Sequence, residues 1–310
     1  MVKCLVTGGA GFIGSHLVDE LIGLGHTVMC VDNESAESND EFYWNNNAVN
    51  IKADVCEYES VYSLMAGVDT VFHLAAEARI QPSLKNPIKT ISTNVVGTAN
   101  VLQAALENRV RRVVYSSTSS AYGKINKMPL EETMPSDCLT PYSVSKVAGE
   151  DLCRMYTRLF GLETITLRYF NVYGLRQPLK GQYAPVIGIF LKQHANKIPM
   201  TVIGDGEQRR DFTHVYDVVR ANITAIETTN KDAYGEVFNI GTGDSHSMLD
   251  IVKYVGGEHV HVEERQGEAR YTLADNKKAS NILGWDSYIK LPYWIDSNRD
   301  IYGKEKEVCG

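Results

Sequence analysis

The sequence predicts an α/β fold in which a doubly wound parallel sheet is followed by a smaller C-terminal lobe. Two observations support this prediction. Over the first two thirds of the chain, short apolar runs alternate with segments of helical length, a pattern typical of βαβ units and parallel sheets. After about residue 172 the pattern changes to loop-like segments and short motifs separated by glycine and aspartate. We therefore expect a first domain over 1–172 and a lobe over 173–310, partly interleaved with it.

The expected strands and helices follow from these runs in order. The apolar runs that predict strands cover residues 2–6, 27–31, 48–52, 70–74, 111–116 and 163–169. The intervening segments with helical periodicity cover residues 13–23, 57–65, 94–108 and 143–160. The sequence has no internal repeat or low-complexity segment, and the last residues, GKEKEVCG, have the composition of a frayed tail.

The N-terminal segment LVTGGAGFIG reads as a strand, a glycine-rich turn and the start of a helix. Gly9, Gly11 and Gly14 satisfy the spacing G-x-G-x-x-G, and Gly8 adds a fourth glycine to the turn. Glycines let the backbone turn tightly and approach a pyrophosphate, whose charge then lies at the helix N-terminus. Asp32 ends the next apolar run, where a carboxylate can accept hydrogen bonds from an adenosine ribose. This context predicts a dinucleotide site in a Rossmann-like fold rather than an ordinary glycine turn.

The composition argues against several other classes of protein. The chain of 310 residues is 44% hydrophobic and 22% charged, and its net charge of −7 comes without a basic run, which argues against nucleic-acid and membrane-surface partners. No apolar stretch has the length of a membrane span, and a fold that begins at residue 2 leaves no room for a signal peptide. The six cysteines lack metal-ligand spacing. We expect a reduced, cytoplasmic protein without a metal site.

A tyrosine and a lysine, Tyr142 and Lys146, stand four residues apart in the segment PYSVSK, on one face of a predicted helix. A tyrosine is a poor base at its usual pKa of about 10. A nearby ammonium group and the positive charge of an oxidised nicotinamide would favour the phenolate and lower that pKa. Such pairs are common on helix surfaces, so the prediction of a catalytic pair depends on the glycine motif and on the segment SSTSSAYG, which follows a predicted strand.

With these motifs the chain resembles the extended short-chain dehydrogenases/reductases, in the NAD-dependent nucleotide-sugar epimerase/dehydratase family. The resemblance is to the UDP-glucose and UDP-N-acetylglucosamine 4-epimerases in particular. It covers nearly the whole chain in order, through TGGAGFIGSH, VDN, ADV, HLAA, NVVGT, SSTSSAYG, PYSVSK, RYFNVYG, GDGEQRRDFTHVYDV and FNIGTG. It implies an NAD-dependent enzyme whose C-terminal lobe binds a nucleotide sugar, with the UDP-linked class inherited from the family.

The resemblance also implies which residues bind the cofactor. The segment NESAES after Asp32 has no Arg or Lys for a 2′-phosphate, which favours NAD over NADP. The family places three glycines at the pyrophosphate, an aspartate at the adenosine ribose and two residues near the adenine, here Gly8, Gly11, Gly14, Asp32, Asp54 and Val55. The other residues expected along the cofactor are Phe12, Ile13, Asn33, Leu74, Ala75, Ala76, Asn94, Ser116, Tyr142, Lys146 and Tyr169.

In the catalytic triad that the resemblance implies, Thr118 hydrogen-bonds the sugar O4 and relays its proton, Tyr142 is the base, and Lys146 binds the nicotinamide ribose. Arginines suit a diphosphate because their planar fork pairs with its oxygens. Thr272 stands where hexose-restricted 4-epimerases carry a bulky tyrosine near the sugar C2 group, so acetylated sugars are expected to be accepted. The expected substrate-binding residues are Glu77, Thr118, Asn171, Arg210, Arg265, Glu268, Arg270 and Thr272.

A nucleotide-sugar 4-epimerase is favoured over a 4,6-dehydratase, the nearest alternative. Dehydratases eliminate water with an acid and a base, and Ser119 and Ser120 occupy the positions of those carboxylates, which serine cannot replace in proton transfer. A threonine at position 118 is a feature that the chain shares more with dehydratases than with 4-epimerases. A UDP-glucuronate epimerase or decarboxylase remains an alternative, as does a catalytically silent NAD-binding sensor, although such sensors often lack the tyrosine or lysine.

Two predicted helices are apolar on more than one face, which suggests a further interface. In relatives the corresponding helices form a four-helix bundle between subunits, so the resemblance implies a homodimer. The apolar residues are Val95, Val96, Val101, Leu102 and Ala105 in one helix, and Val147, Leu152, Met155, Tyr156 and Leu159 in the other.

Overall fold

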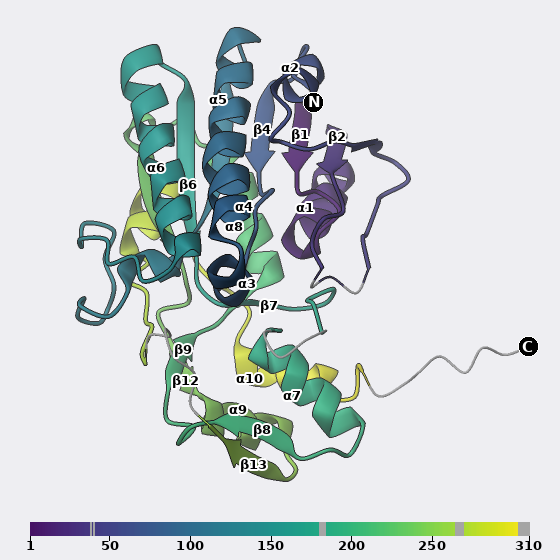
Figure 1. Cartoon of the computed structure of the whole chain (residues 1–310), viewed down its shortest axis with the longest axis vertical. Coiled ribbons are helices and arrows are strands. Elements are labelled where there is room, and N and C mark those ends of the chain that lie inside the picture. Colours follow the sequence, from purple (N-terminus) through teal and green to yellow (C-terminus); the bar gives the residue numbers. More distant parts are fainter. Residues whose placement is uncertain (38, 40, 180–183, 264–269, 303–310) are drawn as a thin grey trace, which may run out of the picture.

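The computed structural model describes residues 1–37, 39, 41–179, 184–263 and 270–302. It has a larger α/β part and a smaller part that follow one another along the longest axis (Figure 1). The larger part contains a seven-stranded sheet in which all neighbouring strands are parallel, so the predicted fold class is confirmed. From edge to edge the strands are β11 (Glu236–Ile240), β6 (Glu163–Tyr169), β5 (Arg112–Thr118), β4 (Thr70–His73), β1 (Lys3–Thr7), β2 (Thr27–Asp32) and β3 (Val49–Lys52).

Helices cover both faces of this sheet because its strands present apolar side chains to both. Along β1, Leu5 belongs to one buried cluster, whereas Cys4 and Val6 belong to another, as expected when successive side chains point to opposite faces. The helices of the first cluster are α2 (Tyr58–Leu64), α5 (Gly97–Glu107) and α6 (Pro141–Phe160), and those of the second are α1 (Phe12–Gly23) and α8 (Val215–Glu227).

The helix that carries Tyr142 and Lys146, α6, begins and ends at capping residues. The Thr140 hydroxyl accepts a hydrogen bond from the Ser143 backbone N–H at 3.2 Å, and the Ser143 hydroxyl accepts one from the Thr140 N–H at 3.1 Å. Pro141 occupies the first turn, and Gly161 ends the helix with a φ of +74°, a left-handed conformation that glycine adopts without strain. Tyr142 and Lys146 therefore lie in the first turns of a well-defined helix.

The segment before α5 differs from the prediction. A helix was expected over 94–108, but helical backbone runs from α4 (Pro87–Ile91) through a π-helical turn, η1 (Ser92–Val96), into α5. The π-turn contains Asn94, which is buried. Other short elements of the larger part are α3 (Ile80–Lys85), the 3-10 turns η2 (Ser119–Tyr122) and η3 (Lys231–Ala233), and the π-turn η4 (Ala279–Leu283).

The smaller part has its own apolar core, to which Phe190, Val202, Ile251 and Ile295 contribute. Its elements are α7 (Val186–Ala195), α9 (Met248–Val255), α10 (Leu291–Asn298) and the parallel pair β8 (Met200–Ile203) and β13 (His259–Val262). Two further pairs are β7 (Val172–Tyr173) with β10 (Thr213–His214), and β9 (Arg209–Asp211) with β12 (Ser245–Ser247). Among the described residues, no helix has the length and apolar character that a membrane span requires.

Beyond residue 172 the chain returns to the larger part in two longer elements, besides the short turns η3 and η4. Helix α8 packs on the sheet, and β11 pairs with β6 as the edge strand. Neither was predicted as an element of the sheet layer. The division at residue 172 stays a prediction, and α8 and β11 are the elements through which the two parts interleave.

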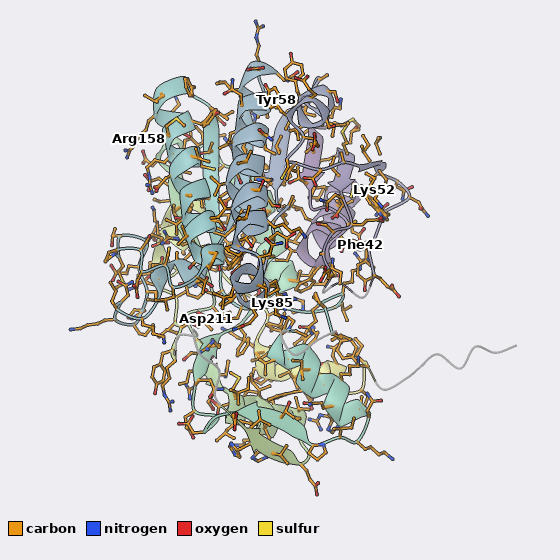
Figure 2. All side chains as sticks on the ribbon, viewed as in Figure 1. Phe42, Lys52, Tyr58, Lys85, Arg158 and Asp211 are labelled. Atoms are coloured by element: carbon orange, nitrogen blue, oxygen red, sulfur yellow. The ribbon has the colours of Figure 1, made fainter. Side chains whose placement is uncertain are left out.

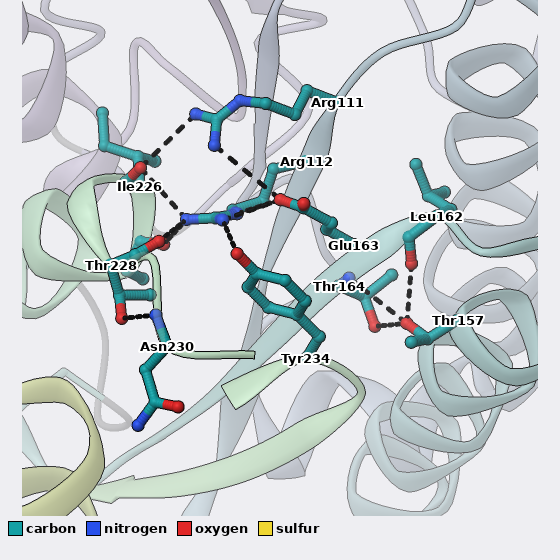
Figure 3. A network of polar contacts seen from close by, with 11 residues as sticks. Arg111, Arg112, Thr157, Leu162, Glu163, Thr164, Ile226, Thr228, Asn230 and Tyr234 are labelled. Carbon is teal, nitrogen blue, oxygen red and sulfur yellow. Dashed lines mark hydrogen bonds and ion pairs between the residues drawn. The ribbon is translucent and has the colours of Figure 1, made fainter. Parts of the chain in front are cut away.

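At the amino-terminal end of β5, Arg112 ties α8 to the sheet (Figure 3). Its side chain is fully buried. It donates to Glu163 at 2.9 and 2.7 Å and to the Tyr234 hydroxyl at 2.8 Å. It also donates to the carbonyls that end α8, those of Ala225, Ile226 and Thr228, at 2.7 to 3.0 Å. The guanidinium thus satisfies carbonyls that a helix end otherwise leaves without partners.

Candidate active site

The turn between β1 and α1 has room for glycine only. Gly8 has a φ of +68°, and a Cβ there would lie 2.7 Å from the backbone nitrogen of Ala75. At Gly14 a Cβ would lie 2.1 Å from the carbonyl oxygen of Gly8. No side chain caps the first turn of α1, so its backbone N–H groups, with Phe12 and Ile13, are available to an anion. These features fit the pyrophosphate of a dinucleotide.

Asp32, at the end of β2, is held beside this turn. Its carboxylate accepts hydrogen bonds from the backbone N–H of Ala10 at 3.2 Å and of Glu34 at 2.8 Å. Burial raises the pKa of Asp32, and these hydrogen bonds act in the opposite direction. Asn33 donates to Asp54 at 2.9 Å. The structure therefore brings together the residues expected at the ribose and the adenine.

The other residues expected along the cofactor follow the carboxyl ends of the central strands, where ligands of open α/β sheets bind. Leu74, Ala75 and Ala76 follow β4, and Val55 lies against α5, where a Cβ on Gly97 would come within 2.8 Å of it. Ser116 and Tyr169, on β5 and β6, share a hydrogen bond of 2.9 Å between their hydroxyls.

Asn94 is engaged by the protein itself. Its amide accepts from the Glu77 N–H at 2.8 Å and donates to the Glu77 carbonyl at 3.2 Å and to the Ser145 hydroxyl at 2.9 Å. The buried side chain therefore holds the segment after β4 against helix α6. The structure supports a positioning role for Asn94 at the candidate site.

Thr118 and Tyr142 meet where β5 ends beside the start of α6. Burial raises the pKa of Tyr142, whereas its hydrogen bond with Thr118 and the nearby Arg79 guanidinium act in the opposite direction. The Thr118 hydroxyl also accepts from the Ser120 N–H at 3.2 Å. The backbone N–H of Tyr142 donates to the Ser83 hydroxyl at 3.3 Å. Thr118 and Tyr142 are thus in contact, as the triad requires.

Lys146, one turn beyond Tyr142, is buried behind it. Its ammonium nitrogen lies 4.3 Å from the centroid of the Tyr115 ring, a favourable cation–π position. Burial lowers the pKa of Lys146 to about 7, while the neighbouring Cys153 and Glu150 act in the opposite direction. Because the ammonium has little access to water, its charge depends on the groups around it.

Two parts of this site were missed by the sequence analysis. Arg79 precedes α3 and lies close enough to Tyr142 for each to shift the pKa of the other. Glu150, four residues after Lys146, is buried, binds Arg168 through two hydrogen bonds of 2.8 and 2.6 Å, and accepts from Ser117. The spacing of Lys146 and Glu150 on one helix was a readable signal, whereas the approach of Arg79 depends on the tertiary fold.

A cavity of about 230 Å³ is lined by chain neighbours of Thr118 and Tyr142, although neither of these two residues is among those that line it. Its lining includes the hydroxyl residues Ser119, Ser120, Thr140 and Ser143 and three expected substrate-binding residues, Asn171, Arg210 and Thr272. No Asp or Glu is among the described residues that line it. The cavity therefore offers hydroxyl, amide and guanidinium groups to a polar ligand.

Asn171, Arg210 and Thr272 are held together by backbone contacts. Asn171 donates to the Asp211 carbonyl at 2.8 Å and to the Thr272 hydroxyl at 3.3 Å, and that hydroxyl accepts from the Asp211 N–H at 3.2 Å. Arg210 donates to the Arg270 carbonyl at 3.0 Å. These hydrogen bonds therefore hold the segments around Asn171, Arg210 and Thr272 against one another.

Asp211 itself, labelled where the two parts meet in Figure 2, is fully buried. Its carboxylate accepts hydrogen bonds from the Thr242 N–H and hydroxyl at 2.8 and 2.7 Å, from the Gly243 N–H at 3.0 Å, and from the Ala274 N–H at 3.1 Å. Burial raises the pKa of Asp211, and these four hydrogen bonds favour the charged form. Asp211, which follows Arg210 in the chain, thus holds the segments of Thr242, Gly243 and Ala274 together.

Three other expected substrate residues, Glu77, Thr118 and Arg270, are not among the described residues that line this cavity. Glu77 forms an ion pair with Lys89 at 2.7 Å, and Arg270 forms one with Asp205. Arg265 and Glu268 lie outside the described residues, so their roles stay predictions. No group of three or more His, Cys, Asp or Glu side chains in the described ranges could hold a metal ion.

The comparisons with known proteins agree with this arrangement. The model of the NAD-dependent epimerase/dehydratase family matches residues 4–241. UDP-glucose 4-epimerase of Mycolicibacterium smegmatis is 34% identical in an alignment 324 residues long, gaps included, which covers 99% of this chain and 100% of that protein.

Two solved structures are similar over almost their whole length. UDP-glucose 4-epimerase of Thermotoga maritima, solved with UDP-glucose, has a TM-score of 0.90 at 35% identity and covers 97% of this chain and 98% of its own. UDP-N-acetylglucosamine 4-epimerase of Methanobrevibacter ruminantium, solved with UDP-N-acetylmuramic acid, has a TM-score of 0.89 at 30% identity and covers 96% and 97%.

Proposed function

The chain belongs to the NAD-dependent epimerase/dehydratase family, and we propose that it is a 4-epimerase of UDP-hexoses and UDP-N-acetylhexosamines. The observation that carries this proposal is the contact of Thr118 with Tyr142, one helical turn before the buried Lys146. The described residues that line the nearby cavity include no carboxylate. Similarity to 4-epimerases over the whole chain supports the same reaction.

The residues at the glycine turn and at the end of β2 fit NAD. The free N–H groups of α1 suit its pyrophosphate and the Asp32 carboxylate suits its adenosine ribose. When bound, NAD accepts hydride from the sugar C4 and returns it, so the reaction has no net redox change. Lys146 would hold the nicotinamide ribose, and its positive charge would favour the phenolate of Tyr142.

The residues of the chain would move one proton. Tyr142 takes the O4 proton through Thr118 as the C4–O4 bond becomes a carbonyl, and gives it back to O4 when C4 is reduced from its opposite face. The Arg79 and Lys146 charges stabilise the phenolate between these two events. Ser119 and Ser120, in the cavity wall, offer no acid or base that could eliminate water from C5 and C6.

Proton NMR of the purified protein with a UDP-hexose tests the proposal. We expect interconversion of the sugars with equatorial and axial 4-hydroxyl groups, without added NADH or net change in absorbance at 340 nm. A 4-keto-6-deoxy product would identify a dehydratase instead. Conversion of UDP-glucuronate alone would identify a uronate enzyme, and no reaction with any UDP-, GDP- or dTDP-sugar would support a silent sensor.

Thr272 is proposed to set the width of the cavity near the sugar C2 group. We expect Thr272→Tyr to lower kcat/KM for UDP-N-acetylglucosamine by about tenfold or more relative to UDP-glucose, because the larger side chain fills space that the acetyl group needs. Thr272→Val is the matched control, since it removes the hydroxyl that Asn171 and the Asp211 N–H contact but keeps the size. If the tyrosine variant retains its activity on the acetylated sugar, Thr272 does not control this specificity.

A homodimer through a four-helix bundle of α5 and α6 is also proposed. These helices lie side by side on one face of the sheet (Figure 1), and Val144 and Leu159 of α6 are 47% and 70% exposed. Light scattering should give twice the 34.5 kDa chain mass. Val144→Glu with Leu159→Glu should shift it to the monomer, whereas Leu24→Glu, at an equally exposed position after α1, should not. A wild-type monomer at micromolar concentration would contradict the proposal.

A cytoplasmic location fits this function. The described cysteines, Cys4, Cys30, Cys56, Cys138 and Cys153, are free thiols, which supports a reducing compartment.

A further inference from the structure

A cation lies beside the carboxylate that is expected to bind the adenosine ribose. Asp32 and Lys52 end the neighbouring strands β2 and β3 and are partners in their parallel register. Lys52, labelled at the edge of the sheet in Figure 2, comes from a segment that the sequence analysis did not consider when it found no Arg or Lys after Asp32. At this position in the fold, a lysine would bind the 2′-phosphate of NADP.

Glu34 engages this lysine. Its carboxylate forms an ion pair with the Lys52 ammonium group and accepts a hydrogen bond from the Trp44 indole N–H at 2.9 Å. The backbone at Glu34 has a φ of +58°, and its N–H donates to Asp32 at 2.8 Å. Two carboxylates therefore share one turn, and the ammonium group of Lys52 is already paired with one of them.

The charges at this turn disfavour a 2′-phosphate on the adenosine ribose. A phosphate monoester carries about two negative charges at neutral pH, and enzymes that accept NADP supply a cation for it at this place. The hydrogen bonds from Lys52 and Trp44 lower the pKa of Glu34, so its carboxylate stays charged at neutral pH. Asp32 and Glu34 together outweigh the one positive charge of Lys52.

We infer that Glu34 is a second determinant of cofactor choice, which excludes NADP by occupying Lys52 and by adding negative charge next to Asp32. Lys52 is then a latent phosphate-binding cation that becomes available when Glu34 loses its charge. The inference rests on the proposed NAD-dependent function and extends it to residues outside the glycine motif and Asp32.

Calorimetric titration of the full chain, freed of any dinucleotide that co-purifies, with NAD and with NADP tests this inference. Glu34→Gln keeps the size of the side chain and removes its charge. We expect this variant to bind NADP about tenfold more tightly than the wild type and to bind NAD within about twofold of it. The gain should shrink as ionic strength rises, because the new interaction is electrostatic and exposed to solvent.

Two further variants identify the cause of the gain. Lys52→Gln added to Glu34→Gln should abolish it, and Glu37→Gln, which removes a charge from the same segment, should leave both affinities unchanged. The inference is overturned if Glu34→Gln binds NADP no better while NAD still binds, or if the double variant keeps the gain. A wild-type chain that binds neither dinucleotide would contradict the proposed function itself.

Discussion

Tyr142→Phe should lower kcat by about 10²–10⁴-fold or more, because general acid–base catalysis contributes that much and the positioned hydroxyl is the only part removed. The ring and the helix should persist, since the Tyr142 N–H still donates to Ser83 and the Thr140 cap is untouched. NAD should therefore remain bound, and KM should change much less than kcat.

The measurement is the initial rate of 4-epimerisation, with the NAD content of the same preparation determined after denaturation. Tyr156→Phe is a matched control, because Tyr156 lies on the same helix but its hydroxyl donates to Gln103 rather than facing the site. Near wild-type turnover of the Tyr142 variant would remove this residue from the role of base. A variant that loses NAD as well would indicate that Tyr142 is needed chiefly for binding.

The largest loss of stability is expected at the amino-terminal end of β5, the end opposite Thr118. Arg112→Met should reduce the free energy of unfolding by about 3–5 kcal/mol, because it removes a fully buried guanidinium that pairs with the partly exposed Glu163 and leaves the final carbonyls of α8 without these donors. The activity of the folded fraction should persist, since Arg112 begins β5 whereas Thr118 ends it.

Urea denaturation followed by circular dichroism measures this loss. The adjacent Arg111 provides the control, because its side chain is 47% exposed and lies 3.7 Å from Glu163. Arg111→Met should cost no more than about 1 kcal/mol, as is usual for an exposed pair. If the two variants lose the same small amount, the buried network of Arg112 does not anchor α8.

The fold was predictable where local sequence carries the signal. The apolar runs around Leu5, Val71 and Ile165 correspond to β1, β4 and β6, because strands buried on both faces read as continuous apolar segments. Strand β11 was missed because its five residues, EVFNI, are short and their pairing with β6 joins parts of the chain about 70 residues apart. The π-turn at Asn94 was also missed, since its apolar periodicity differs little from that of an α-helix.

The candidate site was predictable where a motif fixes the chemistry. The glycine turn, Asp32 and the pair of Tyr142 and Lys146 are each a short pattern with a defined spacing. Arg79 and Lys52 had no such signal, because each approaches its partner only through the tertiary arrangement of α3 or β3. Sequence patterns therefore predicted the groups that are proposed to perform the chemistry, while the neighbouring charges that are proposed to tune them became visible only in the folded chain.

The crossing of the chain between its two parts, through α8 and β11, has a consequence for how such an enzyme can change over evolutionary time. Because the smaller part is not a contiguous insert, it cannot be exchanged for another by a single recombination event without removing the edge strand and a covering helix of the sheet. New substrates are then reached by point substitutions and loop changes around the cavity, at positions such as Thr272. Modular shuffling, which serves many multidomain enzymes, is closed to this architecture.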